Sequence, residues 1–413
     1  MIRPSASFFC QISESGEGSA LAQAAKARRR KVMQKNSLLK VAAALSLMSA
    51  AGVAQADTMR IAHGFPAQSI VDDTFKTLAQ HVEENTDLDT EVFALTVLDL
   101  KQASPGLTSG VADSTMLLTA YFPSEFSEQN FVADLTMVAN LGERPTSIGA
   151  TVGGALMEYV TMQCPECVGQ NLAQNQIGLA FAPGSQFSLL CKEPISSVAD
   201  VRGRAIRGPV SVFRRWAETM GASPITISAN EVFDGLNQGL VDCTINAVGE
   251  MSNLSLFDVV GGITPGMPGG TFGGSGIGQL NLDFWLSLSL GDRKAVARGM
   301  SKATAFMVTG YMKQEVLDLQ TARDQGIAIV EADPGLQSAT KAFIKDDIET
   351  IKAIYRDDFG LENVDEKVET FIGLLEKWKA LTDPLDPTDT EALTELYWTE
   401  IHSKLNLETY GLN

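Results

Sequence analysis

The chain has 413 residues, of which 45% are hydrophobic and 20% charged, and its formal net charge at pH 7 is −18. This length and composition are typical of a globular protein with two domains of ordinary size. The acidic balance argues against a partner such as nucleic acid or an anionic membrane, because their phosphates would be repelled.

Residues 1–56 are predicted to be an N-terminal extension followed by a secretory signal peptide. The apolar run Val41–Ala54 follows two lysines and is too short to cross a bilayer, and a small-residue cleavage motif ends at Ala56. Met33 is the predicted start. Cleavage after Ala56 would remove eight basic and two acidic residues, which changes the net charge from −18 to −24. No later segment has the length and hydropathy of a membrane span, so we expect an exported, soluble periplasmic protein.

The sequence after the signal peptide alternates between strand and helix patterns. A strand is predicted at Met59–Ala62, and a turn and an amphipathic helix with Phe75, Leu78 and Val82 on one face follow it. Further strands are predicted at 91–95, 116–118, 176–182, 187–191, 205–207 and 224–227. This repeated alternation predicts an α/β protein with mainly parallel sheets in two domains.

The later part of the chain opens with a glycine-rich stretch and then becomes helical. Residues 261–278 hold nine glycines in eighteen positions. They lack the motifs of a phosphate-binding loop, so a crossing between domains is predicted. A helix at 293–325 would be long enough to run along both domains. A short strand at 327–330 and two further amphipathic helices around 344–355 and 371–378 follow it.

Four cysteines remain after Ala56, and they allow three fully paired connectivities. Two of them form the sequence Cys164-Pro-Glu-Cys167. A thiol-redox site would need an accessible thiolate in a thioredoxin-like setting, which the neighbouring sequence does not supply. We therefore expect structural disulfides in an oxidising compartment.

The most informative segment runs from 187 to 256. Its pattern is strand, short helix, strand, helix, strand and helix, and the strand at 205–207 ends on Arg207. Open α/β sheets bind their ligands at the carboxyl ends of strands, so Arg207 is the main candidate for a binding residue.

This segment resembles the substrate-binding proteins of TRAP transporters, the tripartite ATP-independent periplasmic systems that import organic acids. The matching motifs are 199–207 (ADVRGRAIR), 220–224 (MGASP), 231–233 (EVF) and 239–242 (GLVD). The resemblance extends from 60–64 (RIAHG) to 281–285 (NLDFW), and several spaced motifs in one order make it specific.

The resemblance implies a two-lobed periplasmic binding protein fold with a long helix spanning both lobes and a helical C-terminus. We expect lobe I to comprise residues 57–184 and 273–312. Lobe II would comprise residues 185–272 and 313–413 with the C-terminal helices.

The resemblance also assigns roles to individual residues. Arg207 corresponds to the arginine that binds the ligand carboxylate, for which its planar fork of donors is suited. The alternative is a surface or interdomain ion pair. Asn246 lies close to the family's second polar contact, and a structural asparagine is its alternative reading.

Two departures from the family pattern make the predicted pocket less polar. Phe233 stands where many relatives have tyrosine, and Phe187 stands where sugar-acid binders carry another arginine. They favour a small or partly apolar organic acid over sialic acid. Trp216, His63 and Tyr121 could form walls of the cleft or simply pack.

The cysteines are a further departure, because Cys243 replaces a usual glycine and Cys191 lies where serine or threonine is common. We expect a disulfide that joins Cys191 or Cys243 to the pair Cys164 and Cys167.

The predicted function is a non-enzymatic receptor that binds a small-molecule carboxylate and delivers it to the integral membrane subunits of a TRAP transporter. We expect a monomer with no catalytic residues, no cofactor and no protein metal site; whether a metal ion bridges the ligand stays open. One alternative is a ligand sensor for a membrane kinase. Another is an exported enzyme, either a thiol oxidoreductase using Cys164 and Cys167 or a hydrolase with few histidines to draw on: His63, His81 and His402.

Overall fold

The computed structural model describes residues 58–412, which lie within a single compact unit. The predicted signal peptide and its cleavage site after Ala56 lie outside the described residues. Among the helices of the described range, none is both long and apolar enough to cross a membrane.

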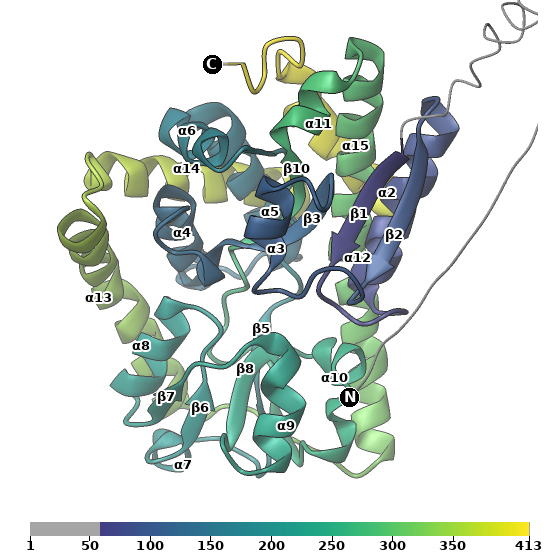
Figure 1. Cartoon of the computed structure of the whole chain (residues 1–413). Coiled ribbons are helices and arrows are strands. Elements are labelled where there is room, and N and C mark those ends of the chain that lie inside the picture. The colour runs from purple at the N-terminus through teal and green to yellow at the C-terminus, as the bar shows by residue number, and fades with distance from the viewer. Residues whose placement is uncertain (1–57, 413) are drawn as a thin grey trace, which may run out of the picture. The chain divides into compact units, whose positions relative to one another are not determined.

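The first lobe is built around a five-stranded sheet in the order β2-β1-β3-β10-β4 (Figure 1). Strand β1 pairs in parallel with β2 and β3, and β10 is antiparallel to β3 and β4. The strands are β1 (Thr58–His63), β2 (Asp89–Ala94), β3 (Ser114–Leu118), β4 (Gln176–Gly178) and β10 (Ser275–Asn281).

The second lobe is built around a six-stranded sheet in the order β11-β9-β5-β8-β6-β7. Strand β6 is parallel to β7 and β8, whereas β5 is antiparallel to β8 and β9. The strands are β5 (Phe187–Cys191), β6 (Ala205–Arg207), β7 (Ser223–Ile225), β8 (Cys243–Ala247), β9 (Gly262–Thr264) and β11 (Ala328–Ile329).

The two-lobed α/β fold is therefore confirmed, although each sheet contains an antiparallel strand. The chain crosses from the first sheet to the second between β4 and β5, and it returns between β9 and β10. Each time it enters the new sheet with a strand that runs against its neighbours. The glycine-rich stretch carries this return crossing, and it also carries β9 and the first residues of β10.

Helices cover both sheets and extend beyond them. In the first lobe they are α2 (Ile70–Asn85), α3 (Ala103–Thr108), α4 (Ser127–Asp134), α5 (Ile148–Glu158), α6 (Pro165–Ala173) and α11 (Leu282–Ser287). The second sheet carries α7 (Val198–Val201), α8 (Ser211–Thr219), α9 (Val232–Asn237) and α10 (Glu250–Asn253). The C-terminal part forms α12 (Leu290–Asp324), α13 (Pro334–Phe359), α14 (Val364–Thr382) and α15 (Thr390–Glu400).

The long helix α12 spans both lobes, as predicted. It packs on α2 and β10 of the first lobe and continues to β11 of the second (Figure 1). Near this second end, Ser252 of α10 donates a hydrogen bond from its hydroxyl to Asp318 of α12 at 2.6 Å. A single rigid element therefore connects the two sheets.

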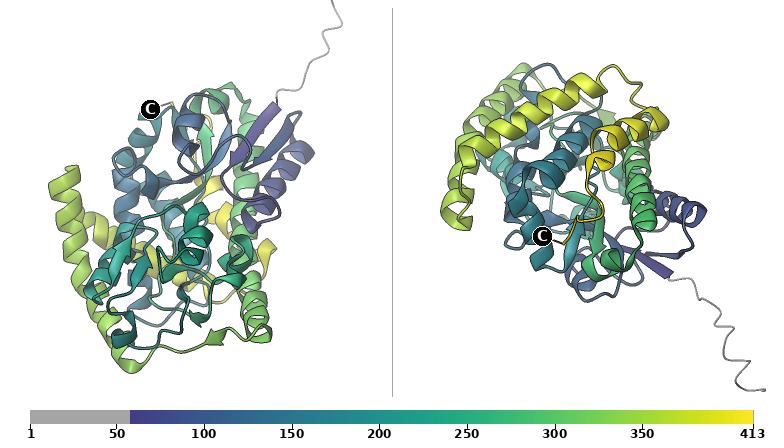
Figure 2. Two further views of the ribbon diagram at one scale, coloured as in Figure 1. Left: turned by 60° about the horizontal axis from the view of Figure 1, so that its bottom comes forward. Right: turned by 90° about the horizontal axis from the view of Figure 1, so that it is seen from above.

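The C-terminal helices wrap around the rest of the molecule (Figure 2). Helix α14 packs on α5 and α15 packs on α12, while α13 reaches from α14 to α4 and α8. The buried side chain of Trp378 anchors α14, and its Nε1 donates to Glu158 of α5 at 2.7 Å. The boundaries of the two lobes given by the sequence stay a prediction.

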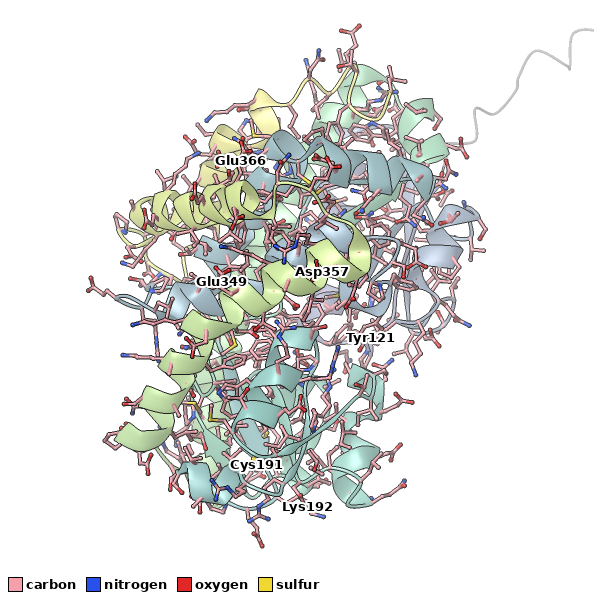
Figure 3. All side chains as sticks on the ribbon, turned by 90° about the vertical axis from the view of Figure 1, so that its left-hand side faces the viewer. Tyr121, Cys191, Lys192, Glu349, Asp357 and Glu366 are labelled. Carbon is pink, nitrogen blue, oxygen red and sulfur yellow. A yellow bond between two sulfur atoms is a disulfide. The ribbon has the colours of Figure 1, made fainter. Side chains whose placement is uncertain are left out.

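The disulfides join Cys164 to Cys167 and Cys191 to Cys243. The expected link between these two pairs is wrong. Cys164 and Cys167 lie at the start of α6 in the first lobe, whereas Cys191 and Cys243 face each other in the paired strands β5 and β8 of the second. Figure 3 shows Cys191 at the lower end of the second lobe, away from Tyr121.

Candidate functional site

A small pocket is lined by residues of both lobes. Most of its walls are apolar. They come from the strands β3 and β5, from α12 and from the connections after β1 and β9: Phe65, Met116, Leu118, Phe187, Phe272 and Met307. A mostly apolar pocket with a few polar groups is typical of a small-molecule site.

The side chain of Arg207 reaches this pocket from the carboxyl end of β6. The family-like motif before it is structural. Asp200 accepts hydrogen bonds from the backbone N–H groups of Ser196 and Ser197, which caps α7, and Gly203 turns the chain with a positive φ. The carboxylate of Asp242 then accepts from the backbone N–H of Ala205 at 2.8 Å. These bonds fix the short strand that presents Arg207.

The guanidinium of Arg207 is buried, with a relative exposure of 2%, and its Nε donates to the backbone oxygen of Ile227 at 3.2 Å. No carboxylate of residues 58–412 lies within 4.0 Å of it. Burial lowers the pKa of Arg207, and the nearby groups of Tyr121 and Glu250 oppose this effect. A buried cation without a paired anion is costly, so a negatively charged group beside Arg207 would be stabilising.

Two further polar side chains of the pocket have unused hydrogen-bonding capacity. Asn246 belongs to β8, and its Nδ2 has no partner among the described residues. Glu250 begins α10; its Oε1 accepts from the hydroxyl of Tyr311 at 2.6 Å, and its Oε2 has no partner in the same part of the chain. Burial raises the pKa of Glu250 to about 7, although the Tyr311 hydrogen bond, the charge of Arg207 and the side chain of Asn253 act in the opposite direction.

Tyr121 joins the two lobes beside Arg207. It ends the short helix η1 (Thr119–Tyr121) of the first lobe, and its hydroxyl accepts from the backbone N–H of Ala229 in the second lobe at 3.0 Å. The side chain of Asn230 also crosses the gap and donates to the backbone oxygen of Gly64 at 3.2 Å. Figure 3 shows Tyr121 at the level where the lobes meet. The lobes are thus closed over the pocket.

The structure brings some of the predicted site residues together and separates others. Arg207, Asn246 and Phe187 line the pocket. Phe233 lines a neighbouring hollow, which shares Ala229 with the pocket.

Trp216 and His63 lie in the core and do not line the pocket. Trp216 donates to Thr340 at 3.0 Å. His63 stacks on Phe75 and faces Asp72 at 3.3 Å.

Sequence reasoning did not single out Glu250 or Tyr311. Glu250 follows β8 by three residues, at the same sheet edge as Arg207, so its position after a strand was a usable signal. Tyr311 lies within the long α12, where it is spaced from the other buried residues as an ordinary core residue would be. Within the described residues, no group of three His, Cys, Asp or Glu side chains is placed to hold a metal ion.

Comparison with known proteins identifies the type of domain. Residues 160–355 match the model of a family described as bacterial extracellular solute-binding protein, family 7. A comparison with curated proteins gave no match.

Solved structures with this fold include a marine metagenome TRAP solute binding protein specific for aromatic acid ligands, from an unidentified microbe. It has 21% identity and a TM-score of 0.66, with 78% of this chain and 99% of that chain covered. The periplasmic ectoine-binding protein of the TeaABC TRAP transporter of Halomonas elongata has 19% identity and a TM-score of 0.65, with 78% and 100% covered. The sugar acid binding protein DctPAm of Advenella mimigardefordensis, in complex with galactonate, has 17% identity and a TM-score of 0.65, with 78% and 99% covered. Residues 160–355 therefore resemble the family 7 bacterial extracellular solute-binding proteins, and the two-lobed fold of the chain is that of the TRAP solute-binding proteins.

Proposed function

We propose that the protein captures a small, partly apolar carboxylate in the periplasm and delivers it to the membrane subunits of a TRAP transporter. The observation that carries this proposal is Arg207, a buried guanidinium without a carboxylate partner among the described residues, in a pocket closed by both lobes. A carboxylate matches the fork of donors on arginine, and burial strengthens the pairing over its value in water.

The apolar lining supports a ligand with a hydrocarbon or aromatic body. Phe187 of β5, two strands away from the strand of Arg207, forms part of the wall and packs on Phe213 with ring centroids 5.1 Å apart; among the described residues that line the pocket, Arg207 is the one cation. A ligand rich in hydroxyl groups would find few partners on such walls, since a buried polar group without a hydrogen bond is costly. Similar proteins of this fold bind aromatic acids or galactonate, so the fold accepts both kinds of acid.

Delivery to a transporter, the periplasmic location and a monomeric state belong to the same proposal. The family is extracellular by its description, and the predicted signal peptide agrees with export. A sensor that presents its bound state to a membrane kinase would use the same pocket, and a pull-down of the membrane partner separates the two. A thiol-redox enzyme is disfavoured because Cys164 and Cys167 are 2% and 0% exposed, which denies a substrate thiol access to the disulfide.

The test is a thermal-shift screen of organic acids, followed by calorimetric titration of the best binder. Three proteins are compared: the wild type, Arg207→Met and the control Arg204→Met. Arg204 lies just before the same strand, and its guanidinium pairs with Glu193 at the surface, 2.8 Å away.

Arg207→Met should weaken binding at least about 100-fold, or about 3 kcal/mol, because the ligand carboxylate would be buried without its counter-charge. Its stability without ligand should stay equal or rise, since a buried unpaired cation is removed. Arg204→Met should bind as the wild type does. Undiminished binding by Arg207→Met, or a wild type that binds no carboxylate, would refute the proposal.

A further inference from the structure

Besides Arg207, the pocket contains a second ionisable side chain, Glu250, to which the proposed function gives no role. Glu250 lines the same pocket and is 7% exposed, so its carboxyl group is shielded from water. The hydroxyl of Tyr311, from α12, holds Oε1 at 2.6 Å and so fixes the direction of the carboxyl group. Within residues 58–412, Oε2 has no hydrogen bond of good geometry, although the side-chain amide of Asn253, whose Nδ2 is also without a partner, lies near enough to lower the pKa of Glu250. A buried carboxyl oxygen with no donor is expensive, which points to a donor on the ligand.

The charges of the pocket decide what kind of donor fits. Arg207 and Glu250 attract each other across the pocket, yet they do not form an ion pair within 4.0 Å. With Glu250 ionised, the two groups together are neutral before a ligand enters. A ligand carboxylate on Arg207 would add one uncompensated negative charge to this enclosed space, next to Glu250. A ligand hydroxyl could donate a hydrogen bond to Oε2, but the extra negative charge would stay uncompensated. A cationic nitrogen on the ligand would both donate to Oε2 and neutralise this charge.

The polar groups of the pocket could bind the two ends of one ligand molecule. Asn246 belongs to β8, the strand beside the one that ends on Arg207, and its Nδ2 has no partner in residues 58–412. It can therefore donate to the carboxylate that Arg207 binds. Apolar side chains form most of the remaining wall, among them Met307 on α12, one turn before Tyr311. A compact hydrocarbon skeleton with a charged group at each end would satisfy every one of these groups.

We infer that the ligand is a zwitterion, a carboxylate that also carries a cationic nitrogen, and that Glu250 is the residue that selects it by binding this nitrogen. The inference rests on the proposed function and narrows its ligand class. The raised pKa of Glu250 fits this role, because a bound cation would supply the neighbouring charge that the buried carboxylate lacks.

The experiment uses matched pairs of acids in which a methyl or methylene group replaces the cationic nitrogen. The pairs are proline and cyclopentanecarboxylate, γ-aminobutyrate and pentanoate, and meta-(aminomethyl)benzoate and meta-ethylbenzoate. Pyroglutamate is added because its ring N–H can donate a hydrogen bond but carries no positive charge, so it tests whether a neutral donor is enough. Affinities are measured by calorimetric titration for the wild type, Glu250→Gln and the control Glu315→Gln. Glu315 is a half-buried carboxyl on the same helix as Tyr311, outside the lining of the pocket.

In at least one pair the wild type should bind the zwitterion about tenfold or more tightly than its uncharged partner. Glu250→Gln should lose this preference by weakening the zwitterion about tenfold, and it should bind the plain acid equally well or better. Glu315→Gln should retain the preference, and pyroglutamate should bind less tightly than proline.

The outcomes separate this inference from the proposed function. If plain acids bind as tightly as zwitterions, or if Glu250→Gln changes both members of a pair alike, only the role of Glu250 is overturned. If the wild type binds neither kind of acid, the proposed function fails and the inference fails with it. Arg207→Met should abolish binding of both kinds, whichever way Glu250 behaves.

Discussion

Arg207, Asn246 and Glu250 share one property: each is buried and each has hydrogen-bonding or charge capacity that the protein itself does not use. Such groups cost stability in the ligand-free state, and a ligand that satisfies them recovers this cost as affinity. The sequence pointed to Arg207 and Asn246 through their motifs and their places on strands. The place of Glu250 just after β8 was a signal that sequence reasoning did not use, but its hydrogen bond from Tyr311 could not be predicted, because Tyr311 lies 61 residues further along the chain.

Another buried residue, His402, makes the stability of the fold depend on pH. Its Nε2–H donates to the backbone oxygen of Leu179 at 2.8 Å, because a carbonyl can only accept, and its Nδ1 therefore accepts from the hydroxyl of Ser301 at 2.7 Å. Burial lowers the pKa of His402 to about 4. Between pH 6.5 and 4 the unfolded chain binds a proton that the folded chain does not, so stability falls as the pH falls.

We predict that His402 alone accounts for a loss of up to roughly 3 kcal/mol in the free energy of unfolding from pH 7 to pH 4. Urea unfolding at pH 7, 6 and 5, followed by tryptophan fluorescence, measures this slope. His402→Gln should be less stable at pH 7 but should show a shallower pH dependence. His81→Gln, at a partly exposed site on α2, should keep most of the slope. An equal slope in wild type and His402→Gln would contradict the assignment.

At the scale of elements, the packing of α14 on α5 depends on a glycine. Gly154 of α5 lies against the indole of Trp378, and a Cβ at this position would overlap three atoms of the ring. The indole cannot retreat easily, because its Nε1 is bonded to Glu158 at 2.7 Å. We predict that Gly154→Ala lowers the free energy of unfolding by about 2 kcal/mol or more through overpacking.

The matched control is Gly373, an exposed glycine inside α14 with no atom near the position of a Cβ. Gly373→Ala should raise stability by about 0.5–1 kcal/mol, since alanine favours the helix. Chemical denaturation of both variants tests the pair. A destabilised Gly373→Ala, or a Gly154→Ala as stable as the wild type, would show that this packing is described wrongly.

Helices and strands with a clear hydrophobic periodicity were predictable from the sequence, and those without it were not. Strands β5 and β6 were predicted with the bounds that they have, because short apolar or alternating runs stand between clear turns. Helix α5 was missed, because it is buried on all sides and carries three glycines, so no amphipathic stripe marks it. The pairing of Cys191 with Cys243 was also beyond the sequence, since it depends on the register of β5 against β8.

At the scale of the whole described unit, polar contacts join the two lobes. Arg215 of α8 binds Asp347 of α13 through two donors, at 2.7 and 2.8 Å, and it also binds Asp134 of α4 at 3.3 Å. Lys101 and Glu231 form a second pair across the lobes at 3.3 Å. Tyr121 and Asn230 add two hydrogen bonds between the lobes, so a ligand that binds both lobes would stabilise all of these contacts together.

The most direct test of the account is a crystal structure of the protein with the carboxylate that binds it most tightly. We predict that the ligand lies in the pocket between the lobes, with both carboxylate oxygens within about 3 Å of the terminal nitrogens of Arg207. A carboxylate bound elsewhere, for example in the neighbouring hollow beside Phe233, or one without contact to Arg207, would contradict the account.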